Sequence, residues 1–259
     1  MLTGTTLADA GIDAAALKPA EVDLTRATAL DVDLLTVDYE GRDHFPSAET
    51  LSSLADEHAV RITTPVRADG FDPLGDDSLL SGLPDGVGRV LVAGHEAYLT
   101  PEEYGRAVAP RLRAAAEAAR DPWVGTESVE RLALAVGGTQ FELLSASTGS
   151  DIQALREAGY DGDVAVYAPT VLTDDEDAIL DAVGAYVARR PSVGATLPDD
   201  AVTDSGADGE VRARLLRAAR EYALVGSVTD VRERVDALRE CGVDTVVGYP
   251  ARGLDPLVE

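Results

Sequence analysis

Short apolar runs alternate with amphipathic segments along almost the whole chain. Several of these runs, such as Val-Leu-Val-Ala and Thr-Val-Val-Gly, are continuous and rich in β-branched residues. Runs of this kind are typical of parallel strands that are buried on both faces. The pattern predicts eight strands, over residues 13–18, 34–39, 60–66, 89–94, 123–126, 140–145, 163–168 and 244–249.

Between these runs the apolar residues recur with the spacing of a helix. The spacing predicts helices over 47–58, 101–120, 128–136, 150–158, 174–190, 210–222 and 228–241. Eight strands separated by helices favour a (β/α)8 TIM-type barrel that forms a single domain over residues 1–259. A doubly wound open sheet is the second choice, because the same alternation is compatible with either fold.

Two segments depart from regular alternation. Residues 191–209 are rich in Pro, Asp, Ser and Gly, which predicts an exposed loop. After the last strand only residues 253–259 remain, so the barrel is expected to lack its closing C-terminal helix. A second subunit could cover the apolar flank that this leaves, so a homodimer is a possible partner state.

The charge of the chain narrows the classes of partner. Asp and Glu number 47 against 22 Lys and Arg, which gives a formal net charge of −25. Such a field repels nucleic acids and anionic membranes, and no apolar run is long enough to cross a bilayer. The N-terminus has no export signal, so we expect a cytoplasmic protein with a small-molecule substrate. A single lysine, no asparagine and an acidic surface indicate a halophilic protein with an acidic proteome.

Polar residues follow the first two predicted strands. Lys18, the only lysine, ends the first strand, and Asp38 and Glu40 end the second. The carboxyl ends of barrel strands converge on one pocket, so these three residues are candidate catalytic groups. Lysine can hold an anion or form a Schiff base, and paired carboxylates serve acid–base chemistry. The structural alternatives are an ion pair of Lys18 with Glu21 and a solvated acidic loop.

Further candidates follow the third, fourth and last strands. Arg67 can clamp an anion in a bidentate manner, and His95, after Gly94, is the best placed of three histidines for catalysis. A turn-rich loop and an ordinary surface histidine are the structural alternatives. Tyr249 and Arg252 close the last strand.

Gly226 and Ser227 open a predicted helix, whose N-terminus can bind an anion; a plain helix cap is the alternative. No P-loop, Gly-x-Ser-x-Gly or Gly-x-Gly-x-x-Gly motif and no zinc-ligand spacing is present, and no metal site is predicted.

The C-terminal third resembles a known superfamily. The stretch YALVGSVTDVRERVDALRECGVDTVVGYP is similar to the tail of the bacterial-luciferase-like proteins, which include flavin- and F420-dependent oxidoreductases. VAVYAPTVLTDDEDAILDAVGAYV resembles the strand and helix before that tail, and VGRVLVAGHEAYLTPEEY resembles the family's Gly-Arg strand and glycine-rich turn. The resemblance covers about the last 95 residues. His95 and Glu96 stand where the glycine-rich turn would continue, and the chain is shorter than most members.

This resemblance implies a luciferase-like barrel oxidoreductase that uses F420 or FMN on an unknown small substrate. It implies cofactor contacts from Arg67, Gly94, Gly226, Ser227, Tyr249 and Arg252, and catalytic groups among Lys18, Asp38, Glu40 and His95. Two alternatives stay open. One is a non-redox barrel enzyme that acts on a small anionic or carbonyl substrate through Lys18. The other is a catalytically inert relative with a binding role.

Overall fold

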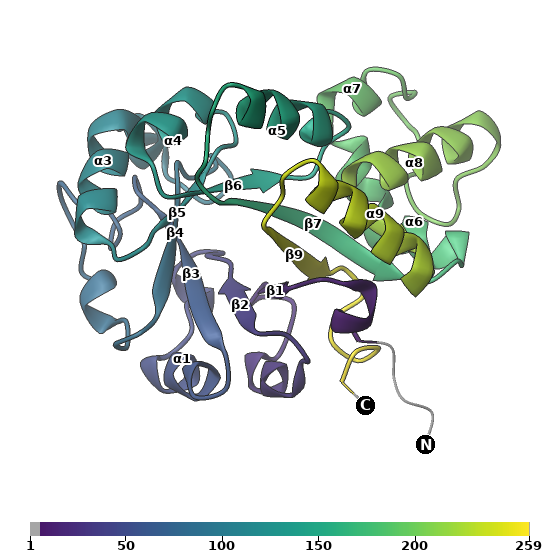
Figure 1. Cartoon of the computed structure of the whole chain (residues 1–259). Helices are drawn as coiled ribbons and strands as arrows, with labels where there is room; N and C mark the ends of the chain where they lie inside the picture. Colours follow the sequence, from purple (N-terminus) through teal and green to yellow (C-terminus); the bar gives the residue numbers. More distant parts are fainter. Residues whose placement is uncertain (1–5, 259) are drawn as a thin grey trace.

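The chain folds into a closed barrel of eight parallel strands surrounded by helices (Figure 1). The computed structural model describes residues 6–258. The strands are β1 (Ala14–Leu17), β2 (Leu34–Val37), β3 (Ala59–Pro65), β4 (Gly88–Val92), β5 (Trp123–Gly125), β6 (Thr139–Leu143), β7 (Val164–Leu172), β8 (Leu224–Gly226) and β9 (Thr245–Pro250). The α-helices are α1 (Ala48–Ala55), α2 (Pro101–Tyr104), α3 (Val108–Ala118), α4 (Glu130–Val136), α5 (Thr148–Glu157), α6 (Glu176–Ala188), α7 (Pro191–Gly194), α8 (Gly209–Tyr222) and α9 (Val228–Glu240). Short 3-10 helices are η1 (Ala8–Ala10), η2 (Leu24–Ala29), η3 (Arg42–His44) and η4 (Leu80–Gly82).

The order of the strands confirms the predicted barrel. Strands β1 to β7 pair in sequence, β7 pairs with β9, and β9 pairs with β1, all in parallel. The β6–β7 and β1–β9 pairings close the sheet, which excludes the doubly wound alternative. The eight barrel strands overlap the eight predicted ones. Strand β8 was not predicted. It lies outside the ring and pairs with the last residues of β7, which extend past the part of β7 that pairs with β6; Thr170 is paired to Leu224.

Helices do not follow every strand. A 3-10 helix, η2, joins β1 to β2, and the long β3–β4 connection contains only η4. The structure divides the predicted helix over 101–120 into two helices: α2 ends at Tyr104 and α3 begins at Val108. No helix follows β9 in the described part of the chain, as the sequence predicts. None of the helices within residues 6–258 has the length and apolar character needed to cross a bilayer.

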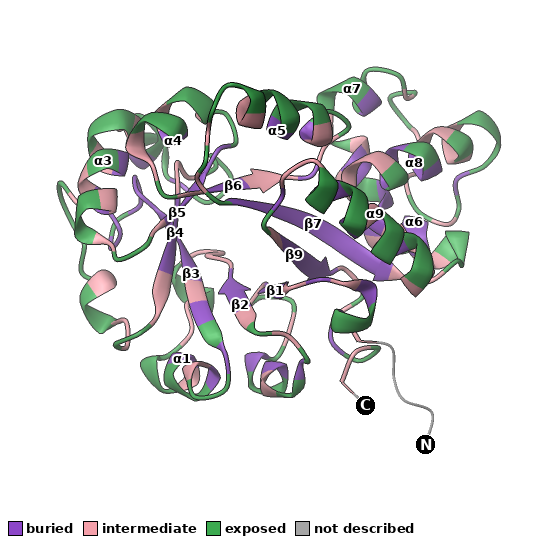
Figure 2. Cartoon of the chain, viewed as in Figure 1, coloured by how far each residue is buried: buried purple, intermediate pink, exposed green. Residues whose placement is uncertain are grey.

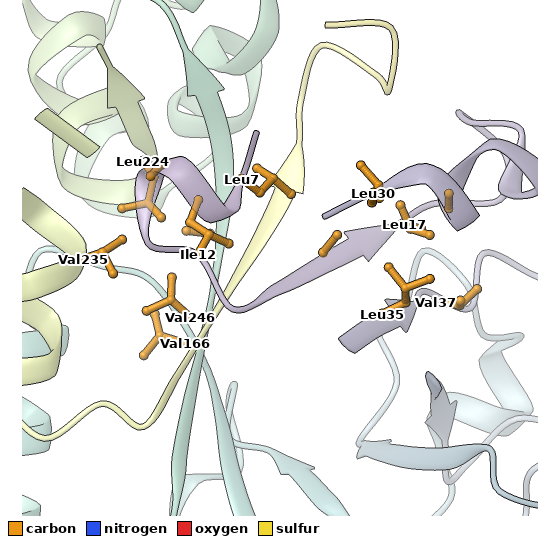
Figure 3. Close-up of a cluster of buried hydrophobic side chains, with 14 of the residues drawn as sticks. Leu7, Ile12, Leu17, Leu30, Leu35, Val37, Val166, Leu224, Val235 and Val246 are labelled. Carbon is orange, nitrogen blue, oxygen red and sulfur yellow. The ribbon is translucent and has the colours of Figure 1, made fainter. Parts of the chain in front are cut away.

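Successive side chains along each strand point alternately outward and inward, so the barrel has two apolar layers. Leu17, Leu35 and Val166 face outward into a large cluster between the strands and the surrounding helices, where Val235 of α9 also packs (Figure 3). The strands are buried, whereas the outer faces of the helices are exposed (Figure 2).

Inside the barrel, a second layer contains small and large side chains. Ala14, Ala16 and Val247 pack with the rings of Trp123, Phe141, Tyr167 and Tyr249. The two alanines leave room for the aromatic rings, so the barrel interior is filled with side chains.

The segment over 191–209 is more ordered than the expected loop. It begins with the one-turn helix α7, and Val193 and Ala207 are buried in it. The backbone N–H of Ser205 donates to Asp181 Oδ1 of α6 at 2.9 Å. Most of its other side chains are exposed. The segment therefore covers part of α6 as well as facing solvent.

Gly184 of α6 is required for this packing. A Cβ atom at Gly184 would lie 1.8 Å from the carbonyl oxygen of Thr203. We expect Gly184→Ala to destabilise the protein by about 2 kcal/mol, because an overpacking cost of about 3 kcal/mol exceeds the gain of about 1 kcal/mol in helix propensity. Urea unfolding measures this change.

Gly149 of α5 provides the matched control. A Cβ there would meet only Cys241 Sγ, at 3.4 Å. Gly149→Ala is expected to leave stability unchanged or slightly higher. Equal changes in stability for the two substitutions would contradict the close approach of the Thr203 carbonyl to α6.

Candidate active site at the carboxyl end of the barrel

Three strands bring a polar cluster to the mouth of the barrel. Lys18 directly follows β1 and Asp38 directly follows β2, while Tyr249 lies in β9. Alternation places Lys18 on the same side of β1 as the interior residues Ala14 and Ala16. The structure thus brings together Lys18, Asp38 and Tyr249, which were predicted as site residues from the ends of three separate strands.

Lys18 is held over an aromatic ring. Its Nζ lies 4.2 Å from the centroid of the Tyr249 ring and 3.3 Å from Glu21 Oε1. The hydroxyl of Tyr249 donates a short hydrogen bond to the other carboxylate oxygen of Glu21. Glu21 therefore fixes both the ammonium group and the phenol. The ion pair with Glu21 that the sequence offered as a structural alternative for Lys18 is present.

Asp38 is the carboxyl group with the most altered acidity in the cluster. It is half-buried, and its carboxylate makes no hydrogen bond to any residue within 6–258. Burial raises the pKa of Asp38 to about 7, which nearby Lys18 opposes and the carboxylates of Glu40 and Glu21 reinforce. A carboxyl group with this pKa exchanges a proton near neutral pH, as a general acid or base requires.

Glu40 joins two of the mouth loops. Its Oε2 accepts a hydrogen bond of 2.8 Å from the backbone N–H of Ala20. This bond fastens the loop after β2 to the loop after β1, and so holds Asp38 next to Lys18. The contact gives Glu40 a positioning role, while its predicted catalytic role stays a prediction.

Two tyrosines form the floor beneath this cluster. The rings of Tyr167 and Tyr249 are stacked, with centroids 6.3 Å apart and planes 8° from parallel. Burial, and then the charge of Asp38, raises the pKa of Tyr167 well above its usual value. Burial and the bond to Glu21 likewise raise the pKa of Tyr249. Both phenols therefore stay protonated and keep their hydroxyls as hydrogen-bond donors.

Arg67 is held by the protein backbone. Its side chain is buried and donates to three carbonyl oxygens, those of Ala93 at 2.6 Å, Gly94 at 2.7 Å and Tyr104 at 2.6 Å. The planar fork thus joins the loops after β3 and β4. Arg67 therefore has a structural role, and Gly94 contributes one of the carbonyls that bind it. Contact of either residue with a cofactor stays a prediction.

Gly226 and Ser227 form a capped helix start. The hydroxyl of Ser227 accepts from the backbone N–H of Asp230 at 3.2 Å, and Asp230 Oδ2 accepts from the backbone N–H of Ser227 at 3.0 Å. The Asp230 carboxylate therefore occupies the place where an external anion would bind α9. The helix cap, offered as the structural alternative, is present.

His95 and Arg252 lie apart from Lys18 and Asp38. His95 is exposed, and its Nδ1 accepts a hydrogen bond of 3.1 Å from the backbone N–H of Ala97. Arg252 is exposed just after β9 and borders a small hollow of about 50 Å³ beside Thr170. Arg252 has no carboxylate within 4 Å among residues 6–258, so its guanidinium is available to a ligand.

Three other residues at the mouth, Glu21, Tyr186 and Arg190, were not singled out from the sequence as site residues. Glu21 is the most important of them, and its only signal was its place three residues after Lys18. Tyr186 of α6 lies close enough to Tyr167 to affect its pKa. Arg190 lies over the Tyr186 ring at 4.4 Å and 3.8 Å from Glu127, which follows β5.

The variant Lys18→Met is expected to raise the pKa of Asp38 further, by about one unit, because it removes the cation that stabilises the ionised carboxylate. Lys18→Arg keeps the charge and is expected to leave the pKa close to the wild-type value. Carbon-detected NMR of the Asp38 carboxyl group over a pH series measures both. The same pKa in Lys18→Met and wild type would show that the ammonium does not act on Asp38.

Comparison with solved structures identifies proteins that share the whole fold. One is an "F420-dependent secondary alcohol dehydrogenase in complex with an F420-acetone adduct", with a TM-score of 0.64, 12% identity and 94% of each chain covered. A second is the coenzyme F420 dependent tetrahydromethanopterin reductase from Methanopyrus kandleri, with a TM-score of 0.62 and 14% identity, over 95% of this chain and 94% of that one. The monooxygenase RslO1 from Streptomyces bottropensis has a TM-score of 0.50 and 14% identity, with 92% of each chain covered.

At 12–14% identity these likenesses establish the fold alone. They agree with the luciferase-like barrel that the C-terminal third resembles. A search of the curated proteins finds no match. The model of a family of unknown function, DUF7388, matches residues 7–257. Because that match spans nearly the whole sequence, the chain belongs to the DUF7388 family.

Proposed function

We propose that this barrel is an oxidoreductase that uses F420 or FMN to act on a small substrate at its carboxyl end. The observation that carries the proposal is Asp38, a half-buried carboxyl group whose pKa is raised to about 7 beside Lys18. Barrel enzymes place their reactive groups at this end. The two F420-dependent enzymes that share the fold support the choice of cofactor class.

The cationic residues at the mouth support a cofactor with an anionic group. The stacked rings of Tyr167 and Tyr249 are buried beneath Lys18, and the guanidinium of Arg252, on the same end of the barrel, has no carboxylate partner among residues 6–258 and can take an anionic group. Lys18, above the Tyr249 ring, adds a positive charge at the mouth. We assign Arg252 to the anionic part of the cofactor, whereas contact of Tyr249 with the cofactor stays a prediction, because its hydroxyl is bound to Glu21 and its ring lies under Lys18. Arg67, Gly226 and Ser227 are not assigned, because backbone carbonyls or Asp230 already occupy their polar groups.

The protein contributes proton handling and orientation. A bound F420 or flavin would supply the hydride chemistry, so few protein groups need to react. Asp38 holds a proton near neutral pH, which it gives to or takes from a substrate oxygen at the mouth. Lys18 stabilises the ionised form of Asp38, and Glu21 keeps Lys18 and the Tyr249 hydroxyl in place. His95 is left outside this arrangement by its exposed position.

Cofactor binding tests the proposal directly. Purified protein is titrated with oxidised F420 and, separately, with FMN, and binding is followed by calorimetry. We expect one of them to bind with a Kd of micromolar order. Arg252→Ser is expected to weaken binding by about 10-fold or more, the usual contribution of a hydrogen bond to a charged group.

Arg113→Ser is the matched control, because Arg113 is exposed on α3 and pairs only with Glu117. It should bind the cofactor like the wild type. If neither cofactor binds at about 100 μM, the proposed function is wrong. Equal losses in Arg252→Ser and Arg113→Ser would reject the assignment of Arg252.

A further inference from the structure

A second cleft lies at the opposite, amino-terminal end of the barrel. It has a volume of about 480 Å³, and its walls come from the starts of strands β3, β5, β6 and β7. The residues that matter for its chemistry are Arg61, Trp123, Asp121, Asp161 and Asp163. The Lys18–Asp38 cluster follows the carboxyl ends of β1 and β2, at the other end of the barrel, so this cleft is a separate site.

The cleft contains an arginine without an acidic partner. Arg61 has no carboxylate within 4 Å among residues 6–258, in a chain with 47 acidic residues. Its Nε is buried without a hydrogen-bond partner, and its Nη1 donates to the backbone carbonyl of Asp121 at 2.8 Å. No hydrogen bond to the described residues involves Nη2. Burial lowers the pKa of Arg61, and the nearby charge of Asp121 opposes this shift.

The guanidinium of Arg61 is held in a fixed orientation. Its central carbon lies 4.8 Å from the centroid of the Trp123 ring. The guanidinium is therefore fixed between an aromatic face and the Asp121 carbonyl, while Nη2 is left for a ligand. A fixed planar fork of this kind suits the two oxygens of a carboxylate.

The walls of the cleft contain backbone in uncommon conformations. Asp121, which is not a glycine, has φ 45°, and Gly138 has φ 79°. A Cβ at Gly138 would lie 2.4 Å from the carbonyl oxygen of Pro122, so only glycine allows the two segments to approach. A left-handed conformation at a residue other than glycine, as at Asp121, collects at ligand sites, where the surrounding structure maintains it.

The charges around Arg61 define the class of ligand. Asp121, Asp161 and Asp163 border the same cleft and are exposed, so the rim of the cleft carries three carboxylates and one guanidinium. An anion with several charges would be repelled by them. A ligand that carries one carboxylate and one positive group satisfies both. We propose that this cleft binds a small zwitterion of the α-amino-acid type, with its carboxylate on Arg61 and its ammonium group facing the acidic rim.

The single tryptophan of the chain reports on this site. Trp123 is the only tryptophan and it touches Arg61, so its emission follows binding in the cleft. The protein is titrated with individual α-amino acids, acetate, methylammonium and inorganic phosphate, with calorimetry as a second readout. We expect at least one α-amino acid to give saturable binding, about 10-fold or more tighter than acetate, methylammonium or phosphate.

Variants of Arg61 complete the test. Arg61→Gln is expected to weaken amino-acid binding by at least about 10-fold, and Arg61→Lys, which keeps the charge without the fork, to weaken it less. Arg113→Gln makes the same change on the exposed face of α3 and should bind like wild type. The proposal is overturned if no α-amino acid binds at about 10 mM, if acetate or phosphate binds as tightly, or if both Arg61 variants bind like wild type. None of these outcomes depends on F420 or FMN.

Discussion

At pH 8, the variant Asp38→Asn is expected to be more stable to urea than the wild-type protein, by up to about 4 kcal/mol. The pKa of Asp38 is about 7 in the folded protein, against an ordinary value of 3.8. Between these values the folded state keeps a proton that the unfolded state has lost. Wild-type stability therefore falls as the pH rises from about 4 to about 7. Asparagine has no such proton, so the variant avoids this cost.

At pH 4 the two proteins should be nearly equal in stability, because a neutral carboxyl and an amide are similar in size and polarity. Asp43→Asn makes the same substitution at an exposed position in the same loop, and should change stability by less than about 0.5 kcal/mol. If Asp38→Asn is no more stable than wild type at pH 8, Asp38 does not carry a raised pKa. A stability cost at this position is typical of residues kept for function.

The variant Arg67→Met is expected to lose about 2–5 kcal/mol of stability. Three partly buried backbone carbonyls, those of Ala93, Gly94 and Tyr104, would lose their donor. A buried polar group without a partner costs about 1–3 kcal/mol. Arg67→Lys should lose somewhat less, since an ammonium group does not reach three carbonyls in the plane of the fork. Urea unfolding at constant pH and salt measures the series.

Arg113→Met is the control for Arg67, because it removes an exposed arginine that pairs with Glu117 and should cost less than about 0.5 kcal/mol. Retained stability in Arg67→Met, together with lost affinity for F420 or FMN, would reverse the assignment. Arg67 would then bind the cofactor, as the sequence predicts, and the backbone contacts would be secondary.

The barrel strands were predictable because they are buried on both faces. Continuous apolar runs predicted the eight strands of the ring, and the residues at the strand ends predicted Lys18 and Asp38 as site residues. Strand β8, Leu224–Gly226, was missed because it stands between α8 and α9 with only one residue on either side. The break between α2 and α3, over residues 105–107, was also missed.

The contacts within the site were less predictable, because they join residues far apart in the chain. Glu21 and Tyr249 are separated by 228 positions, and Arg67 reaches carbonyls 26 to 37 positions away. His95 follows a strand as Asp38 does, yet it is exposed after Gly94, whose φ of 85° turns the chain. Position at a strand end therefore predicts the region of a side chain, but its direction depends on the loop that follows.

The pKa of Asp38 in the wild-type protein is the most direct test of the candidate active site. Carbon-detected NMR of the assigned Asp38 carboxyl, over a pH series in the folded protein, gives this value. A pKa of about 7 is expected, which would establish a proton-exchanging group beside Lys18 at the mouth of the barrel. A pKa near the ordinary 3.8 would contradict the account, because Asp38 would then be a permanently ionised carboxylate at neutral pH.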